Sequence, residues 1–384
     1  MKDQMPDRAV AGPKSSLSEV AWLFFKLGCI AFGGPAAHIA MMEDEVVKKR
    51  RWMSHDHFLD LVGATNLIPG PNSTEMTMHC GHERAGWPGL VVAGVCFIFP
   101  AVVITSVFAW AYQQYGQLPD VAAFIYGIKP AVIAIIISAV IALGKKALKS
   151  VELAILGAAT AVACLAGVNE IAALFGCGLA GVLLYLIRHR KTTLNSVVPL
   201  AVMQLAALTP QLTNGRVFWS FLKVGALLYG SGYVLFAFLD AELVSKGLLS
   251  RQQLIDAIAV GQFTPGPVLS TATFVGWQLH GAWGALAATV GIFLPSFLFT
   301  ALLNPLIPKM RRSKLMGAFL DAVNVAAVAV IVAVCVEMAQ ATLTDWRTVL
   351  IAILSLLVTF VFKKLNSAFL VLGGAVLGYL LLLV

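Results

Sequence analysis

Two stretches of this sequence decide its fold: residues 66–73, Asn-Leu-Ile-Pro-Gly-Pro-Asn-Ser, and residues 262–270, Gln-Phe-Thr-Pro-Gly-Pro-Val-Leu-Ser. Each carries a Pro-Gly-Pro triplet inside a long apolar run. Proline lacks a backbone N–H and clashes with the preceding helical turn, and glycine adds backbone freedom. A continuous helix therefore cannot pass through either triplet, and we expect both apolar runs to be broken there.

The composition around these triplets is that of a membrane protein. Of the 384 residues, 59% are hydrophobic and 12% are charged, whereas about 25% of the residues of a soluble domain are charged. The net charge of +8 does not indicate a nucleic-acid partner, because the basic residues form short clusters between apolar runs. The cysteines and histidines show no metal-ligand spacing. We therefore expect the lipid bilayer as the surroundings, and no metal or other cofactor.

The basic clusters also predict an orientation. Thirteen apolar runs set an upper limit on the crossings, since a crossing helix needs about 20 apolar residues. Residues 1–18 lack the features of a signal peptide, and we expect them to be a cytoplasmic tail. With every run crossing, the cytoplasmic loops then include the Lys/Arg-rich loops at 145–150, 188–194, 304–315 and 363–366, as the positive-inside rule requires.

One basic loop, at 48–51, falls on the wrong side in this count. It returns to the cytoplasm if the runs at 20–40 and 57–79 are re-entrant hairpins rather than full crossings. Both runs have helix-breaking centres, Gly33-Gly34-Pro35 and the first triplet. Broken backbone is tolerated at membrane depth where it lines a cavity. We keep both readings of these two runs open.

The second half of the chain repeats the first. The triplets begin at Pro69 and Pro265, 196 residues apart, and Lys26 and Lys223 lie 197 residues apart in similar contexts. We therefore expect an all-α polytopic membrane protein with two tandem repeats of about six transmembrane or re-entrant helices each, at 19–192 and 216–384. Segment 193–215 connects them. If its apolar run at 195–208 crosses the bilayer, the second repeat is inverted, an architecture whose substrate sites lie at discontinuous helices near the midplane.

The broken helices predict an anion site. A helix that begins after such a break exposes its first N–H groups and the positive end of its dipole, which favour anions. We expect Asn72 and Ser73 to be cap residues of one such helix. Two such ends would form a cradle for an oxyanion; a purely structural kink is the alternative. The predicted site comprises Gly33, Gly34, Asn66, Pro69, Gly70, Pro71, Asn72, Ser73, Gly230, Ser231, Thr264, Pro265, Gly266, Pro267 and Ser270.

Two lysines join this predicted site. Lys26 and Lys223 each lie inside an apolar run, shortly before a glycine-rich break. A cation at membrane depth usually faces a cavity or a partner, and two of them suit a dianion. The alternative is that each side chain snorkels to the interface.

Several acids near the breaks are candidates for carrying a coupling ion, with the proton as one option. They are Glu43, Asp60, Glu75, Asp240 and Asp256. Asp60 and Asp256 are equivalent in the two repeats, and Glu75 lies four residues before His79, on one helical face. The alternative is that these acids simply favour helix starts. No nucleophile elbow or phosphate-binding loop occurs, so we expect a transporter and no enzyme.

At these motifs the sequence resembles the chromate ion transporter family. The resemblance rests on Phe32–Pro35, Asn66–Pro71 and Gly261–Pro267, and it extends over the chain from about residue 20 as in the family's long two-domain members. It implies an inner-membrane protein that exports chromate, a tetrahedral dianion, and confers chromate resistance. The resemblance also implies that the membrane potential or an ion gradient, rather than ATP, supplies the energy.

Several alternatives stay open at this point. Sulfate has the same charge and shape as chromate, so a sulfate transporter is the second reading. A passive anion channel and a membrane-embedded phosphatase of lipid pyrophosphates are further readings. The phosphatase would need a cluster of nucleophilic and basic residues near a break, and arginine is nearly absent from the apolar runs. The coupling ion, a homodimer and the dominant half of the site also stay open.

Overall fold

The protein is described from a computed structural model that covers residues 17–188, 213–303 and 313–383, apart from residues 33, 117, 230, 231, 363 and 364. These described residues form helices and no strand, which confirms the predicted all-α class. Five of the helices are long and apolar enough to cross a membrane. Most of the predicted tail and of the predicted connecting segment lies outside the described residues.

The first repeat begins with short helices and ends with long ones. Its elements are α1 (Leu17–Ile30), α2 (Gly34–Met42), the π-helix η1 (Glu43–Lys49), α3 (His55–Thr65), α4 (Asn72–Tyr115), α5 (Pro119–Ala147), α6 (Val151–Leu165) and α7 (Glu170–Arg188). The first triplet lies between α3 and α4, so the apolar run at 57–79 is broken where the sequence predicts it.

The second repeat has the same order of elements. They are α8 (Asn214–Leu227), α9 (Val234–Leu239), the π-helix η2 (Asp240–Val244), α10 (Arg251–Phe263), the 3₁₀-helix η3 (Val268–Ser270), α11 (Thr271–Leu303), α13 (Lys314–Thr342), α14 (Trp346–Val361) and α15 (Ser367–Leu382). The second triplet lies between α10 and η3. Even the π-helical segments recur at equivalent positions.

The long helices α4 and α11 each reverse direction near one end. In α4 the backbone leaves the helical region at Ala85 and Gly86, and Gly86 has a φ of +63°. The two arms then lie against each other so closely that a Cβ on Gly81 would be 2.3 Å from the carbonyl oxygen of Gly89. The first arm of α4 and α3 therefore form a hairpin around the triplet, and the second arm is long enough to cross.

The same close packing is repeated in the second half and between neighbouring helices. In α11 the reversal is at His280 and Gly281, and a Cβ on Gly276 would be 2.3 Å from the carbonyl oxygen of Gly284. Glycine also lets α1 approach α4 and α8 approach α11, because a Cβ on Gly28 or Gly225 would meet a backbone carbonyl at 2.5 Å or 2.3 Å. Both repeats thus use glycine for the same contacts.

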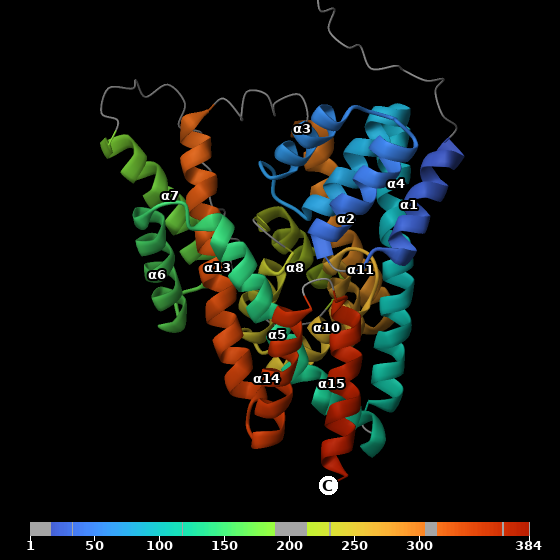
Figure 1. Cartoon of the computed structure of the whole chain (residues 1–384), viewed down its shortest axis with the longest axis vertical. Helices are drawn as coiled ribbons and strands as arrows, with labels where there is room; N and C mark the ends of the chain where they lie inside the picture. The colour runs from blue at the N-terminus through green and yellow to red at the C-terminus, as the bar shows by residue number, and fades with distance from the viewer. Residues whose placement is uncertain are drawn as a thin grey trace, which may run out of the picture.

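The equivalent helices α5 and α13 run in opposite directions. Figure 1 shows α5 rising from the lower end of the molecule, whereas α13 descends from the upper end, next to α5 and α7. The C-terminal helix α15 ends at the lower end. These directions agree with the predicted inversion of the second repeat.

We predict that the hairpin of α11 depends on Gly276. The substitution Gly276→Val places methyl groups against the backbone of Gly284 and should lower the stability by about 1–3 kcal/mol, as overpacking does. Gly373→Val is the matched control, since nothing lies within 4 Å of a Cβ on Gly373. Thermal unfolding in detergent micelles measures both. Equal melting temperatures for the two variants would contradict the close packing.

Candidate functional site

The two triplets are held by a reciprocal pair of hydrogen bonds between the repeats. The N–H of Gly70 donates to the carbonyl oxygen of Leu228 at 2.7 Å, and the N–H of Gly266 donates to that of Ala31 at 2.8 Å. Ala31 and Leu228 follow α1 and α8, which are equivalent helices. Each triplet is thereby fixed to the first break of the opposite repeat. These two N–H groups are occupied by the protein and do not face an anion.

A cavity of about 510 Å³ lies beside these breaks. We call it the lysine cavity, because Lys146 and Lys149 line it at the end of α5. Five further segments contribute polar residues or glycines to its wall: α2, the end of α3, the start of α4, the residues just before α9, and α13. These residues are Gly34, Asn66, Asn72, Gly232, Tyr233, Asp321 and Asn324. Residues of both repeats therefore form its wall. Both lysines are exposed, so the cavity reaches the surface there.

The amides of the lysine cavity are held in place by the broken helices. Asn72 is the first residue of α4, and Pro71 occupies the cap position without a side-chain hydrogen bond, so the prediction of Asn72 and Ser73 as cap residues is wrong. Proline sets the extended backbone that a cap needs. The Asn72 amide donates to Asn66 Oδ1 at 2.6 Å, and the Asn66 amide donates to the Val62 carbonyl oxygen at 2.9 Å.

The two cavity lysines differ in whether an acid balances their charge. Lys149 Nζ lies 2.6 Å from Asp321 Oδ1. Lys146 forms no ion pair with any acid in the part of the chain that the structure describes. An uncompensated cation at the mouth of a cavity attracts anions. Lys146 was not among the residues predicted from the sequence, because it reads as one of several basic residues in a loop.

Part of the predicted anion site lies at the cavity and part lies behind it. Gly34, Asn66 and Asn72 line the cavity. Ser73 and Ser270 are buried, and the Ser270 hydroxyl lies 3.5 Å from that of Thr105. The Thr264 hydroxyl donates to the carbonyl oxygen of its own helix at Val260. The remaining predicted glycine and serine positions, Gly33, Gly230 and Ser231, lie outside the described residues.

Lys26 and Lys223 each face a carboxylate of the following π-helix. Lys26 Nζ lies 3.6 Å from Glu45 Oε1, and Lys223 Nζ lies 2.8 Å from Glu242 Oε2. Burial acts to raise the pKa of the Glu45 carboxyl, but hydrogen bonds from Arg50 and Lys49 outweigh it, and the pKa lies below its ordinary value. Neither lysine lines the lysine cavity, and their contact with an anion stays a prediction.

The acids predicted to carry a coupling ion differ sharply in their surroundings. Glu43 Oε1 lies 3.3 Å from His55, and Asp240 Oδ2 lies 3.2 Å from the equivalent residue Arg251. Asp256 also faces a cation, as described next, and Asp60 has an interaction partner. Glu75 is fully buried, and neither of its oxygens has a hydrogen-bond partner among the described residues.

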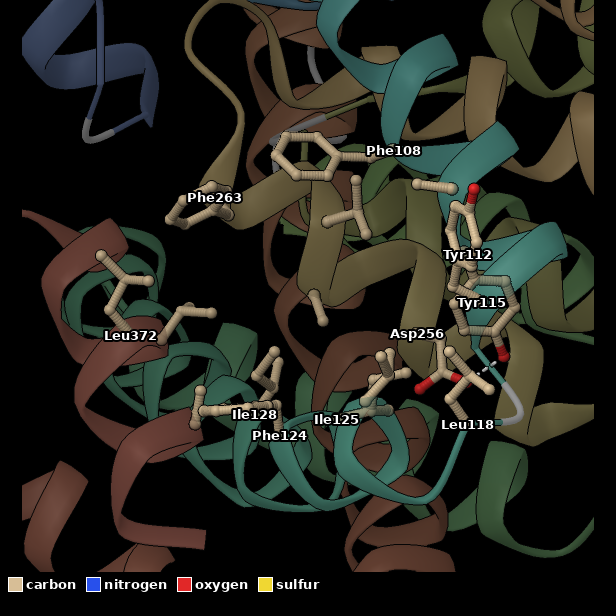
Figure 2. A pocket seen from close by; sticks show the side chains of 16 residues that line it. Phe108, Tyr112, Tyr115, Leu118, Phe124, Ile125, Ile128, Asp256, Phe263 and Leu372 are labelled. Carbon is tan, nitrogen blue, oxygen red and sulfur yellow. Dashed lines mark hydrogen bonds between the residues drawn. The ribbon is translucent and has the colours of Figure 1, made fainter. Parts of the chain in front are cut away.

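Sequence reasoning missed one buried cation. Lys129 Nζ lies 3.1 Å from Asp256 Oδ1, and the Tyr112 hydroxyl donates to Asp256 Oδ2 at 2.6 Å. Figure 2 shows Asp256 and Tyr112 at one side of a second, apolar cavity of about 600 Å³ between α4, α5, α10 and α15. The signal was present in the sequence, since Lys129 is a lone charge in an apolar run, where a cation usually has a partner.

Comparisons with known proteins give one consistent result. The sequence model of the family described as "Chromate transporter" matches residues 18–182 and 215–379. The chain is 31% identical to the chromate transport protein of Cupriavidus metallidurans over 98% of this chain and 97% of that protein. It is 32% identical to that of Pseudomonas aeruginosa over 96% and 93% of the two chains. The probable chromate transport protein of Synechococcus elongatus is 30% identical, over 95% and 96%. No solved structure matches the chain.

We predict that Lys129 and Asp256 depend on each other for stability. Removing one member of a buried ion pair leaves an uncompensated charge and costs about 3–5 kcal/mol. Lys129→Met alone should therefore lower the melting temperature strongly in detergent, whereas Lys129→Met combined with Asp256→Asn should recover most of the loss. A double variant as unstable as the single variant would show that the pair is not the cause.

Proposed function

The chain belongs to the chromate transporter family, and we propose that it exports chromate across the cytoplasmic membrane through the lysine cavity. The observation that carries this proposal is the lysine cavity itself. It combines the uncompensated charge of Lys146 with the amides of Asn66 and Asn72, at a place where broken helices of both repeats meet. Substrate sites of inverted-repeat transporters lie at such breaks.

The chemistry of the cavity suits a tetrahedral dianion. Chromate presents four oxygens that accept hydrogen bonds, and a charged donor such as Lys146 makes the strongest of these bonds. Asn72 is the first residue of α4, where the positive end of the helix dipole lies. The cavity volume of about 510 Å³ leaves room for an anion with part of its water shell.

The basic loop that ends α5 supports an outward direction of transport. By the positive-inside rule, the loop with Lys145, Lys146 and Lys149 lies in the cytoplasm, so the lysine cavity would load chromate from inside the cell. The membrane potential, negative inside, then favours outward movement of a dianion. At about 2.3 kcal/mol per charge and 100 mV, it supplies roughly 4.6 kcal/mol for two charges. This driving force needs no ATP.

Sulfate is the second candidate substrate, and one observation favours keeping it. The polar residues at the cavity are Lys146, the Lys149–Asp321 pair, Tyr233 and three asparagines. The lysines and amides recognise charge and oxygen atoms rather than the central atom of the anion. We therefore expect excess sulfate to inhibit chromate transport. Saturation of the flux with substrate separates a transporter from a passive anion channel.

We predict that Lys146→Ala impairs chromate uptake into everted membrane vesicles, in which export appears as uptake. Loss of a hydrogen bond to a charged group costs about 1.5–3 kcal/mol, so KM should rise at least about tenfold. Lys145→Ala is the matched control, because Lys145 is a neighbouring exposed lysine that does not line the cavity. Equal KM values for the two variants would remove Lys146 from the site.

The same assay tests the predicted lysine pair. Under the proposal that chromate loads through the lysine cavity, Lys26→Ala and Lys223→Ala should change KM less than Lys146→Ala, because each lysine faces a carboxylate and lies away from that cavity. A larger rise in KM for either variant than for Lys146→Ala would move the anion site to the paired lysines.

A further inference from the structure

The carboxyl group of Glu75 is the most unusual polar group in the described part of the chain. Its side chain lies in the first arm of α4 and is 0% exposed, and neither oxygen has a hydrogen-bond partner among the residues with described positions. The ion pairs among the described residues do not include it. Buried polar groups are nearly always hydrogen-bonded, and an exception of this kind calls for an explanation.

The position of Glu75 links it to both repeats. A Cβ on Gly70 would lie 2.1 Å from Glu75 Oε1 and 2.7 Å from Ser296 Oγ, so the carboxyl lies directly against the glycine of the first triplet. Ser296 belongs to α11 of the other repeat, and its buried hydroxyl also lacks a partner. Asn72, which lines the lysine cavity, lies one turn earlier on the same helix as Glu75.

Among the residues that the structure describes, no cation is positioned to balance a charge on Glu75. On its own helix the nearest titratable group is His79, which is buried and whose Nε2 has no partner. Tyr229, which follows α8, is within electrostatic reach of the carboxyl. The charged or titratable groups on the other elements packed against α4 are engaged elsewhere or lie at the ends of helices: Glu19, Lys26, His38, His55, Asp56, His57, Asp60, Tyr233, Arg251, Asp256 and His280.

An ionised carboxylate in this place would be very costly, since burying an unpaired charge costs far more than a lost hydrogen bond. Glu75 therefore carries its proton in this state of the protein. The second repeat has no such group, because the equivalent residue is Thr271, whose hydroxyl donates to the Val268 carbonyl oxygen. A titratable group has thus been placed in one repeat only, at a break beside the lysine cavity.

We propose that Glu75 is the proton-binding site that couples transport to a pH gradient. This inference rests on the proposed function. The proton is held while the carboxyl is buried between the triplet and α11, and it leaves when the repeats rearrange and the carboxyl meets water. Protonation also removes a negative charge one turn from Asn72, so a proton at Glu75 and a dianion in the lysine cavity favour each other's binding, as linkage requires. The proton and chromate therefore cross in the same direction, and the membrane potential acts on one net negative charge per cycle instead of the two of uncoupled export.

The test uses the full chain in liposomes, with the membrane potential clamped at zero. Two quantities are measured for labelled chromate: counterflow at equal pH, and accumulation driven by an imposed pH difference. The native chain should show both. Glu75→Gln imitates the protonated carboxyl, so it should keep counterflow within about twofold of the native rate and lose the pH-driven accumulation. Glu83→Gln, which changes a part-exposed acid of the same arm, should behave like the native chain.

The outcomes separate this proposal from the proposed function. Native protein without chromate counterflow would overturn chromate transport itself. Counterflow with no pH-driven accumulation in the native chain, or accumulation that survives in Glu75→Gln, would overturn the proton site alone. Loss of counterflow in a folded Glu75→Gln variant would also overturn it, by placing Glu75 in anion binding. If Glu75→Gln does not fold, Glu75→Thr, which introduces the residue of the second repeat, takes its place.

Discussion

The structure depends on the two hydrogen bonds that fix each Pro-Gly-Pro triplet to the opposite repeat, Gly70 to Leu228 and Gly266 to Ala31. The prolines on either side of each glycine have no N–H, so the glycine supplies the donor of its triplet. At membrane depth a backbone donor without a partner costs several kcal/mol. Each triplet breaks a helix of its own repeat. The N–H of its glycine donates to a backbone carbonyl oxygen that the first helix break of the opposite repeat leaves without a helical partner. Two breaks from each repeat are thus brought together, and the lysine cavity lies beside them.

The two repeats share the ion pairs that stabilise the fold, whereas the groups that we connect with transport differ between the repeats. The pairs Lys26 with Glu45 and Lys223 with Glu242 are equivalent, as are Glu43 with His55 and Asp240 with Arg251. Such repeated pairs stabilise both halves in the same way. The groups that we connect with transport are not repeated, because Glu75 corresponds to Thr271 and Lys146 corresponds to Ala341. One anion pathway and one proton site require a single set of these groups. A duplicated fold supplies a single set when the residues of one repeat change and those of the other do not.

Much of the architecture could be predicted from the sequence, because it depends on local rules. The all-α class, the duplication and the positions of the breaks follow from composition, spacing and the chemistry of proline and glycine. Two features could not be predicted, and a third was missed although the sequence carries its signal. The partners of Gly70 and Gly266 are more than 150 residues away in sequence, and nothing in the spacing identifies them. Lys26 was predicted to contact the anion, and its partner Glu45 was not predicted, because Glu45 belongs to a π-helix that the sequence does not indicate. Lys129 was missed because it has no counterpart in the second repeat.

The central claim is that chromate enters the lysine cavity from the cytoplasm. Asn324 lines this cavity on α13, and Asn324→Cys allows the claim to be tested with a membrane-impermeant thiol reagent. Everted vesicles present the cytoplasmic face, and labelling is measured above the background of the six native cysteines. We predict labelling in everted vesicles that chromate slows in a saturable manner. Labelling only in right-side-out vesicles, or labelling that chromate does not slow, would contradict the claim.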